Sequence, residues 1–421
     1  MQKTYETYKD SGIEWIGVVP SHWSICQFKR LHCGSNVGES IDKQYWINDN
    51  QGYIFYTAGI KPINTNYINF PKEKYTKEND LLLARNGTPY VYLPAINAVY
   101  TDHIIRVSIK SIADKKYIYY ALSKAISNEV VDTVSIATWS ASLWNAQYLP
   151  IPPFSEQQAI AEYLDKKCSK IDSLVAELEQ QVTDLGTMKK AEISRVVTKG
   201  LNPDAPLKDS GIEWMGNVPN HWNVQPLKRA LLDKMMYGAN ESAESDNKEY
   251  PRYIRITDIA ESGELKEETF KSLPPDKAQG YMLKKGDVLF ARSGATVGKT
   301  FLYNLDEPAC FAGYLIKAEC DKELLSPAYL MYYTKSNGYD NWKNSVFAQA
   351  TIQNIGADKY SLLPITLPSI SEQQTIVKHL DTYCAKVDAT VKELQYQIAD
   401  LKLYKQSIIS EAVTGKIKVI D

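Results

Sequence analysis

The feature that most constrains this chain is a long stretch that occurs twice. SEQQAIAEYLDKKCSKIDSLVAELEQQ, which begins at Ser155, returns as SEQQTIVKHLDTYCAKVDATVKELQYQ, which begins at Ser371. In each copy the serine is followed three residues later by a glutamine, Gln158 or Gln374. This spacing predicts a capping box, in which the serine accepts from the amide of the glutamine while the glutamine reaches back. Two long helices are therefore expected.

The apolar residues of both copies recur every three or four positions, which predicts one apolar stripe on each helix. The stripe positions are Ile171, Leu174, Leu178, Val182, Leu185 and Met188 in the first copy, and Val387, Val391, Leu394, Ile398, Leu401, Tyr404 and Ile408 in the second. A stripe this long with charged outer faces needs a partner helix, and the other copy can supply it. We expect an antiparallel coiled-coil pair that ends near Gly200 and Gly415. The alternative is that each helix packs separately inside one globule.

A second pair of matching segments indicates that the whole chain is duplicated. KDSGIEWIGVVPSHW at 9–23 recurs as KDSGIEWMGNVPNHW at 208–222, and DLLLARNG at 80–87 corresponds to DVLFARSG at 287–294. A period of about 210 residues is too long for a solenoid. Each copy is therefore a globular part followed by a long helix. By symmetry, we expect residues 9–23 to lie beside the end of the second helix.

Short β-strands and turns dominate the globular parts. Strands are expected at residues 52–60, 80–85, 103–109, 252–259, 287–292 and 314–318, and short helices at 115–126 and 326–336. The predicted fold is α+β. Two similar globular domains, 1–154 and 201–370, are separated by two long antiparallel helices, 155–200 and 371–421, which form a coiled-coil spacer with a pseudo-two-fold internal repeat.

Composition limits the classes of function. The sequence has neither a run of eighteen apolar residues nor a signal-peptide apolar region, so we expect a soluble, cytoplasmic protein with no membrane partner. The six cysteines lack metal-binding spacing, and Cys168 and Cys384 lie beside the stripes as expected of small buried residues. The formal net charge is −2. Any surface for nucleic acid must therefore be local or shared with a partner.

The duplication suggests a kind of target. Two related but diverged domains on a fixed spacer suit a ligand with two half-sites at a set separation. Duplex DNA is such a ligand, since half-sites one helical turn apart lie about 34 Å from centre to centre. Identical domains would bind a palindrome, whereas diverged domains would bind two different half-sites.

Four motifs occur in paired order along nearly the whole chain. The GIEWIG and GIEWMG openings, GDVLFARSGATVGKT at 286–300, the SEQQ-initiated helices and AVTGK at 412–416 together resemble the specificity subunit of type I restriction–modification enzymes. The resemblance implies two target recognition domains, each reading one half of a bipartite, asymmetric double-stranded DNA sequence. It also implies that the helices dock two methyltransferase (modification) subunits, to which the restriction and translocase subunits attach. The chain itself would be non-catalytic and bind no cofactor, with SAM, ATP and Mg in the partner subunits.

The segment SGATVGKT at 293–300 resembles a phosphate-binding loop, but only three residues separate Gly294 from Gly298, where four are needed. A loop that contacts DNA is favoured, and a purely structural hairpin is the alternative. Its candidate residues are Arg292, Ser293, Thr296 and Lys299. Arginine can bind guanine or phosphate through two hydrogen bonds.

The corresponding loop of the first half contains Arg85, Asn86 and Thr88. It departs from the family pattern RSGxxGK, so we expect it to be built differently. Arg85 and Arg292 each lie at the end of a predicted strand, and both are predicted to contact DNA.

Further candidates lie in two other pairs of segments. Matching loops before the long helices contain Thr138, Trp139 and Ser140 in one half and Gln349, Thr351 and Gln353 in the other; strand-to-loop junctions contain Thr57 and Lys61, and Arg255 and Thr257. Side-chain amides can bind adenine edges. Trp139 either stacks on a base or belongs to the core, and Arg255 either contacts DNA or forms a structural ion pair. The pairs His22-Trp23 and His221-Trp222 are expected to pack at the junctions.

Two other functions stay open. A single-chain DNA methyltransferase or nuclease would explain why Ile151-Pro-Pro-Phe154 resembles an amino-methyltransferase motif. Isoleucine, however, replaces the polar residue that would hold the target amine, and no glycine-rich SAM loop is evident. A coiled-coil scaffold that joins partner proteins without binding DNA is the other alternative.

Overall fold

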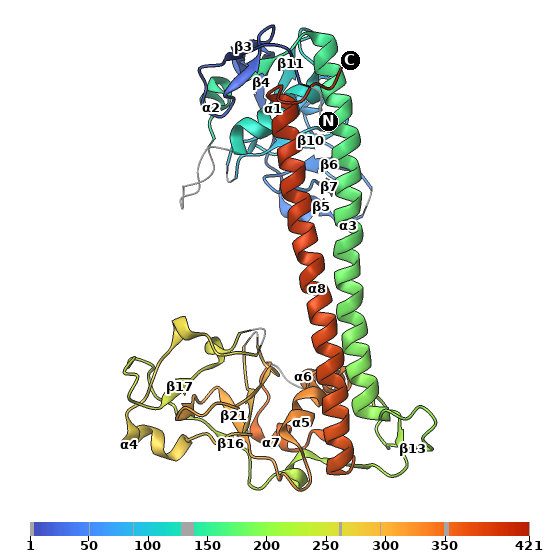
Figure 1. Ribbon diagram of the computed structural model, residues 1–421, viewed down its shortest axis with the longest axis vertical. Coiled ribbons are helices and arrows are strands. Elements are labelled where there is room, and N and C mark those ends of the chain that lie inside the picture. The colour runs from blue at the N-terminus through green and yellow to red at the C-terminus, as the bar shows by residue number, and fades with distance from the viewer. Residues whose placement is uncertain are drawn as a thin grey trace. The chain divides into compact units, whose positions relative to one another are not determined.

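The computed structural model describes residues 4–49, 51–86, 88–127, 139–260, 263–294, 296–348 and 353–420 (Figure 1). The chain divides into two compact units. Unit 1 comprises Met1–Glu179 and Gln395–Asp421, and unit 2 comprises Gln180–Leu394. Helices α3 (Phe154–Lys199) and α8 (Ile370–Val413) both continue from one unit into the other. Each unit therefore contains one globular part and a portion of each long helix. The proposed division into recognition domains 1–154 and 201–370 stays a prediction.

The predicted capping boxes are wrong, because both long helices begin one residue earlier. In α3 the amides of Glu156 and Gln157 donate to the carbonyl of Pro153, which places Ser155 inside the first turn. In α8 it is Ser369, not Ser371, whose hydroxyl accepts from a first-turn amide, that of Glu372, at 3.3 Å. The residue before each helix thus accepts from first-turn amides, whereas the boxes assigned that role to Ser155 and Ser371.

A buried glutamine at the start of each long helix joins it to its globular part. Gln157 accepts from the amide of Asp114 at 2.9 Å and donates to the carbonyl of Pro152. Gln373 accepts from the amide of Ser326 at 2.8 Å and donates to the carbonyl of Pro368. These glutamines precede the ones that the capping-box pattern selected.

The two long helices form an antiparallel pair within each unit (Figure 1). In unit 1, Lys402 and Lys405 contact Glu179 and Asp172. In unit 2, Lys189 contacts Asp388. The apolar seam alternates steps of four and three residues, which is the heptad spacing of a coiled coil. Its residues are Leu164, Cys168, Ile171, Val175, Leu178, Val182 and Leu185 in α3 and Leu380, Cys384, Val387, Val391, Leu394, Ile398, Leu401 and Ile408 in α8.

Three positions of the predicted stripe lie off this seam. Leu174, Met188 and Tyr404 are exposed, and Val175 is buried instead. The helix repeats every 3.6 residues, so a stripe counted by threes drifts off the buried face that the heptad follows. Cys168 and Cys384 are buried as expected, and burial raises the pKa of each thiol.

The globular part of unit 1 contains two four-stranded sheets and two strand pairs. One sheet has the order β10-β6-β7-β5 and the other the order β4-β11-β8-β9, with separate pairs β1-β2 and β12-β3. The strands are β1 Tyr8–Asp10, β2 Val18–Pro20, β3 Ser24–Gln27, β4 His32–Val37, β5 Trp46–Ile47, β6 Tyr53–Tyr56, β7 Ile63–Thr65, β8 Asp80–Ala84, β9 Val91–Tyr92, β10 Val99–Tyr100, β11 Ile104–Ile109 and β12 Tyr148–Ile151. Helices α1 (Lys115–Ser127) and α2 (Ala141–Ala146) complete it.

The globular part of unit 2 repeats the second of these sheets, with the order β16-β21-β18-β19, beside the pairs β13-β14, β15-β22 and β17-β20. The strands are β13 Leu207–Asp209, β14 Asn217–Pro219, β15 Asn223–Pro226, β16 Met236–Tyr237, β17 Arg252–Ile254, β18 Val288–Ala291, β19 Thr300–Leu302, β20 Ala309–Phe311, β21 Leu315–Ala318 and β22 Pro364–Leu367. The helices are α4 Pro275–Ala278, α5 Pro327–Tyr333, α6 Asn337–Phe347 and α7 Ala357–Ser361. The predicted α+β fold with an internal repeat and paired long helices is confirmed.

Matching junctions hold each opening segment against the helices. Trp23 and Trp222 are fully buried, and their ring nitrogens donate to Glu156 at 3.2 Å and to Glu372 at 3.1 Å. His22 lies 2.9 Å from Glu156 and His221 lies 3.0 Å from Glu372. The prediction that these His-Trp pairs pack at the junctions is confirmed.

The opening segment contacts the end of α8 inside unit 1, as the repeat predicts. The hydroxyl of Tyr8 donates to the carbonyl of Gly415 at 3.1 Å. Gly415 has a φ of +71°, and a Cβ there would lie 2.4 Å from Pro20, so only glycine fits both the turn and the contact. In unit 2 the equivalent residue, Gly200, packs against Trp222. Residues 9–23 thus lie beside the end of α8, as expected.

No helix in the described part of the chain is long and apolar enough to cross a membrane. Within those same residues, no group of three or more His, Cys, Asp or Glu side chains could hold a metal ion.

Candidate nucleic-acid interface

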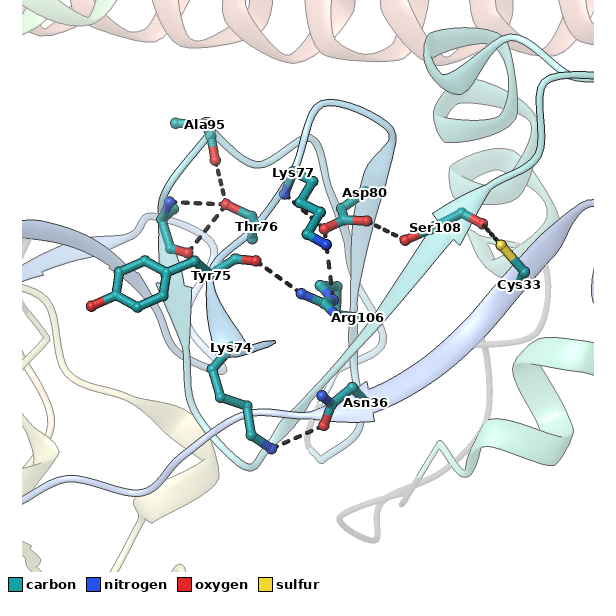
Figure 2. Close-up of polar contacts among 11 residues, drawn as sticks. Cys33, Asn36, Lys74, Tyr75, Thr76, Lys77, Asp80, Ala95, Arg106 and Ser108 are labelled. Atoms are coloured by element: carbon teal, nitrogen blue, oxygen red, sulfur yellow. Dashed lines mark hydrogen bonds and ion pairs between the residues drawn. The ribbon is translucent and has the colours of Figure 1, made fainter. Parts of the chain in front are cut away.

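A buried carboxylate anchors the start of each strand that leads to a candidate arginine. Figure 2 shows Asp80 at the start of β8, where it accepts from the amide of Lys77 at 2.7 Å and from the hydroxyl of Ser108. The guanidinium of Arg106, on the neighbouring strand β11, lies 3.6 Å away. β8 then runs through five buried residues and ends just before Arg85. Asp80 therefore helps to fix where Arg85 leaves the sheet.

The same construction recurs in unit 2. Asp287 precedes β18, accepts from the amide of Lys284 at 2.8 Å and lies 3.7 Å from Lys317 of β21. Burial is the main reason why the pKa of Asp287 is raised above its ordinary value. β18 ends just before Arg292. The two candidate arginines therefore occupy equivalent places at the ends of equivalent strands.

Arg292 is held by its surroundings but keeps donors available. Its guanidinium lies over the ring of Tyr237, 5.0 Å from the centroid, and its Nε donates to Asn354 at 3.4 Å. Its backbone pairs with Tyr314 and Ile355. Its terminal nitrogens have no hydrogen-bond partner among the described residues. An aromatic ring beneath a guanidinium orients it while leaving the planar fork available for a ligand.

Arg85 is less constrained. Its amide donates to the carbonyl of His103 and its carbonyl accepts from the amide of Trp139, both at 2.7 Å. Its exposed side chain makes no hydrogen bond or ion pair with any residue that the structure describes. Asn86 lies 2.7 Å from the ring of His103, and Thr88 is exposed. Both arginines thus have donors that no described residue engages, and their contact with DNA stays a prediction.

The loop after Arg292 makes two tight turns. The amide of Val297 donates to Gly294 and that of Lys299 to Thr296. Ser293 pairs through its backbone with Asn354. Lys299 is exposed, and Ser293 and Thr296 are partly exposed. The hairpin is short and β19 follows it, so the structure agrees with rejecting a phosphate-binding loop before a helix.

Trp139 is a core residue, and the alternative that it stacks on a base is wrong. Only 7% of its surface is exposed, and its ring lies 5.0 Å from that of Trp144. Trp139 belongs to the hydrophobic core cluster of unit 1. Ser140 is partly exposed but caps α2, where its hydroxyl accepts from the amide of Leu143 at 3.4 Å.

Arg255 forms the structural ion pair that was the alternative to DNA contact. Two of its nitrogens donate to Asp258, at 3.0 and 2.7 Å, and one also donates to the carbonyl of Thr269. Asp258 is almost fully buried. A free Arg255 would leave that carboxylate unpaired, which is costly. The hydroxyl of the exposed Thr257 lies 3.4 Å from Asp258.

The remaining candidates are scattered. Thr57 accepts from the amide of Gly59 at 3.3 Å and is partly exposed, whereas Lys61 and Gln353 are exposed. Thr138, Gln349 and Thr351 lie outside the described residues. In unit 2 the structure places Arg292, Ser293, Thr296 and Lys299 on one loop, and the pairing of Ser293 with Asn354 brings Gln353 beside it.

Tyr237 and Asn354 were missed by sequence reasoning. Tyr237 follows the start of the short strand β16, whose register pairs it with Ile316 of β21. The only signal was the internal repeat, because Val37 pairs with the equivalent Ile105 in unit 1. Aligning Val37 with Tyr237 would have flagged an aromatic substitution at an exposed strand end.

Comparisons with known proteins identify relatives along the whole chain. A family model described as Type I restriction modification DNA specificity domain matches residues 33–184 and 236–399. The Type I restriction enzyme MjaVIII specificity subunit of Methanocaldococcus jannaschii is 24% identical over 424 residues, covering 95% of this chain and 94% of the relative. The Type I restriction enzyme EcoBI specificity subunit of Escherichia coli is 25% identical over 319 residues, covering 72% of this chain and 66% of the relative.

A solved chain from work described as "Structural basis underlying complex assembly and conformational transition of the type I R-M system" superposes with a TM-score of 0.68 at 15% sequence identity. It covers 94% of this chain and 98% of the solved chain. At that identity the likeness concerns the fold alone.

Proposed function

Because the chain belongs to the family of type I restriction–modification DNA specificity subunits, we propose that its two units read two different halves of one bipartite DNA site. The observation that carries this proposal is the pair of arginines at equivalent strand ends. Arg85 and Arg292 both lack a carboxylate partner among the described residues, yet their surroundings differ. Equivalent position supports a shared task, and different surroundings support different half-sites.

The chain determines which DNA sequence is bound, and its partner subunits catalyse the reactions. We propose that two methyltransferase subunits dock on it and carry SAM, and that restriction and translocase subunits bring ATP and Mg. The methyltransferases would flip the target base out of the duplex to modify it. With a formal net charge of −2, the chain would share phosphate contacts with these partners.

The test is to express the chain with its cognate methyltransferase subunit in cells that lack other modification systems and to sequence the methylome. A single bipartite motif with two unlike halves is expected. Arg85→Ala and Arg292→Ala should each relax a different half. A methylome without any new motif, together with no selective retention of a random duplex library by the complex, would support a scaffold instead.

We further propose that the paired helices set the gap between the half-sites. Inserting seven residues after Val182 and seven after Ile398 preserves the heptad phase of both helices. At about 1.5 Å per residue this adds about 10 Å, or about three base pairs of duplex. The methylome motif should keep both halves and gain about three unspecified positions. An unchanged gap in a complex that still methylates would contradict this spacer role.

A further inference from the structure

A basic hollow of about 580 Å³ lies within unit 2, next to the loop that carries Arg292. The loop and the start of β19 contribute Thr296, Lys299 and Thr300, and the turn between α5 and α6 contributes Lys335. Lys343 comes from α6 and Lys190 from α3. Four lysines thus line it.

Two of these lysines are held in place by one carboxylate. Asp340 contacts Lys190 at 2.5 Å and Lys343 at 2.7 Å. Burial pushes the pKa of Asp340 up, but the hydrogen bonds from Lys190 and Lys343 outweigh it and lower the pKa of this carboxyl. The negative charge of Asp340 is therefore already paired with Lys190 and Lys343.

The other two lysines are uncompensated. Among the residues that the structure describes, no carboxylate is in ion-pair contact with Lys299 or Lys335, and Lys335 has only the ring of Tyr332, at 5.6 Å, beneath its ammonium. The described lining therefore carries four positive charges against one negative charge. Such an excess attracts an anion.

The walls of the hollow are fixed before any ligand arrives. Tyr339 donates to the carbonyl of Gly298 at 2.8 Å, and the hydroxyls of Thr300 and Thr334 lie 2.7 Å apart. Gly298 has a φ of +85°, and a Cβ there would lie 2.3 Å from the side chain of Lys343. Glycine at this position lets the loop close over Lys343. The lysines thus extend from segments that hydrogen bonds hold in place, which limits the conformational entropy lost when a ligand binds.

Among the described residues, the corresponding loop of unit 1 differs from that of unit 2. The amide of Ala84 donates to Tyr90, just as that of Ala291 donates to Lys299, so Tyr90 occupies the place of Lys299. The unit 1 hairpin is two residues shorter between these bonds. The position that carries Lys299 in unit 2 therefore carries no lysine in unit 1.

We propose that this hollow binds a phosphodiester of the DNA backbone while Arg292, on the same loop, contacts the bases. The inference rests on the proposed function and adds a contact that positions the duplex without reading its sequence. Ala291 pairs with Lys299 across the hairpin, so Lys299 lies close to Arg292 along the loop. A base contact and a backbone contact from one loop suit a duplex that runs past it.

The test uses the complex with its methyltransferase subunits and a duplex that contains the methylated motif. Binding is measured from 50 to 200 mM salt for the native chain, for Lys299→Gln/Lys335→Gln and for Lys322→Gln. Lys322 lies at the opposite end of the β18-β21 pair and serves as the control. Each lost phosphate contact should reduce the slope of log K against log salt by about 0.9, so the double variant should lose about 1.8. Across this salt range its affinity should fall about 12-fold less than that of the native complex.

A second arm identifies the source of the phosphate. Duplexes with single neutral methylphosphonate linkages are compared for the native and doubly substituted complexes. One or two linkages beside the half-site of unit 2 should weaken the native complex, and the double variant should lose nothing further at those positions. If inorganic phosphate at constant ionic strength weakens the native complex and no methylphosphonate does, the hollow binds a free anion and the proposal fails.

The remaining outcomes separate this inference from the proposed function. If the native complex selects its motif and the double variant has an unchanged salt slope, the phosphate-site proposal fails and the proposed function stands. A changed motif would mean that these lysines contact bases and would also overturn it. A native complex without sequence selection would instead remove the proposed function.

Discussion

The two loops that follow β8 and β18 show how one repeated fold can carry two specificities. In unit 2, Arg292 lies over Tyr237 and beside Asn354, next to a hollow lined by four lysines. In unit 1, Arg85 occupies the same place, but Val37 replaces Tyr237 and Tyr90 replaces Lys299. The strands beneath, anchored at Asp80 and Asp287, are alike.

The two halves differ on their loop surfaces and agree in their core strands and junctions. The core strands and the junctions keep the same contacts in both units, because buried packing tolerates little change. The loop surfaces, which bear no such constraint, differ in length, aromatic support and charge. Substitutions in each unit can test this difference between the halves.

The largest effects are expected at the junctions that the two units share. Trp23→Ala and Trp222→Ala each empty a fully buried site and remove a hydrogen bond to Glu156 or Glu372. Each should lower the free energy of unfolding of its unit by about 3–5 kcal/mol. Urea unfolding monitored by fluorescence measures this, with the exposed Val18→Ala as the control. A loss below about 1 kcal/mol in only one unit would show that the junctions are not equivalent.

The next largest effects are expected at the arginines. Removing a bidentate contact to a base should cost about 1–3 kcal/mol of discrimination, or about 5- to 150-fold. Arg292→Ala should relax only one half of the motif and Arg85→Ala only the other, as measured by binding to duplexes with single base-pair changes. Arg292→Lys should retain charge but lose most of the discrimination. Full affinity and unchanged preference for Arg292→Ala would contradict base contact.

A smaller effect is expected from the aromatic support. Tyr237→Val gives unit 2 the residue that unit 1 has, and it removes a cation–π contact of about 0.5–1 kcal/mol. Discrimination at the base assigned to Arg292 should fall by about 2- to 5-fold. Tyr237→Phe keeps the ring and should retain discrimination. Equal losses for both variants would instead assign the effect to the Tyr237 hydroxyl, which accepts from the amide of Ala357 at 2.9 Å.

The smallest effect distinguishes the helix contacts of the two units. Hydrogen bonds from Arg195 and then from His379 lower the pKa of Glu192 in unit 2 to about 2, although burial opposes them. The equivalent position in α8 is the buried Ile408. Because the folded-state pKa lies below the unfolded value, this stabilisation is present above about pH 4.5 and is lost as the pH falls toward 2.

The measurement is the urea midpoint of unit 2 between pH 5 and pH 2.5. The native chain should lose stability over this interval more steeply than Glu192→Gln, while unit 1 should behave alike in both proteins. Parallel pH profiles for the two proteins would show that Glu192 gains nothing from its partners on folding.

Much of the fold could be predicted because it depends on periodic or repeated patterns. The apolar stripes predicted the helix pair, and the repeat predicted that residues 9–23 would lie beside the end of the second helix, where Pro20 meets Gly415. Errors arose where a neighbour in space decided the outcome. The carbonyl of Pro153 accepts from the first-turn amides of Glu156 and Gln157, so Ser155 lies inside the helix and does not cap it. Val175 rather than Leu174 is buried.

The candidate site was less predictable than the fold. Arg85 and Arg292 were found because each follows a buried strand. Trp139 and Arg255 were ambiguous because a tryptophan suits both core and stacking, and an arginine suits both DNA and a carboxylate. In the structure Trp139 packs against the ring of Trp144, and Arg255 pairs with the buried Asp258. The local sequence encodes neither contact.

The duplication, the two paired helices and the strand-end arginines could be recognised in the amino-acid sequence, because repeated segments and apolar spacing act through local geometry. Tertiary structure alone decided which polar groups are available. Packing buries Trp139, pairs Arg255 with Asp258, places Tyr237 beneath Arg292 and gathers Lys299 and Lys335 into one hollow. The physical reason is that availability depends on which neighbours remove water and charge from a side chain, and folding brings those neighbours from distant parts of the chain.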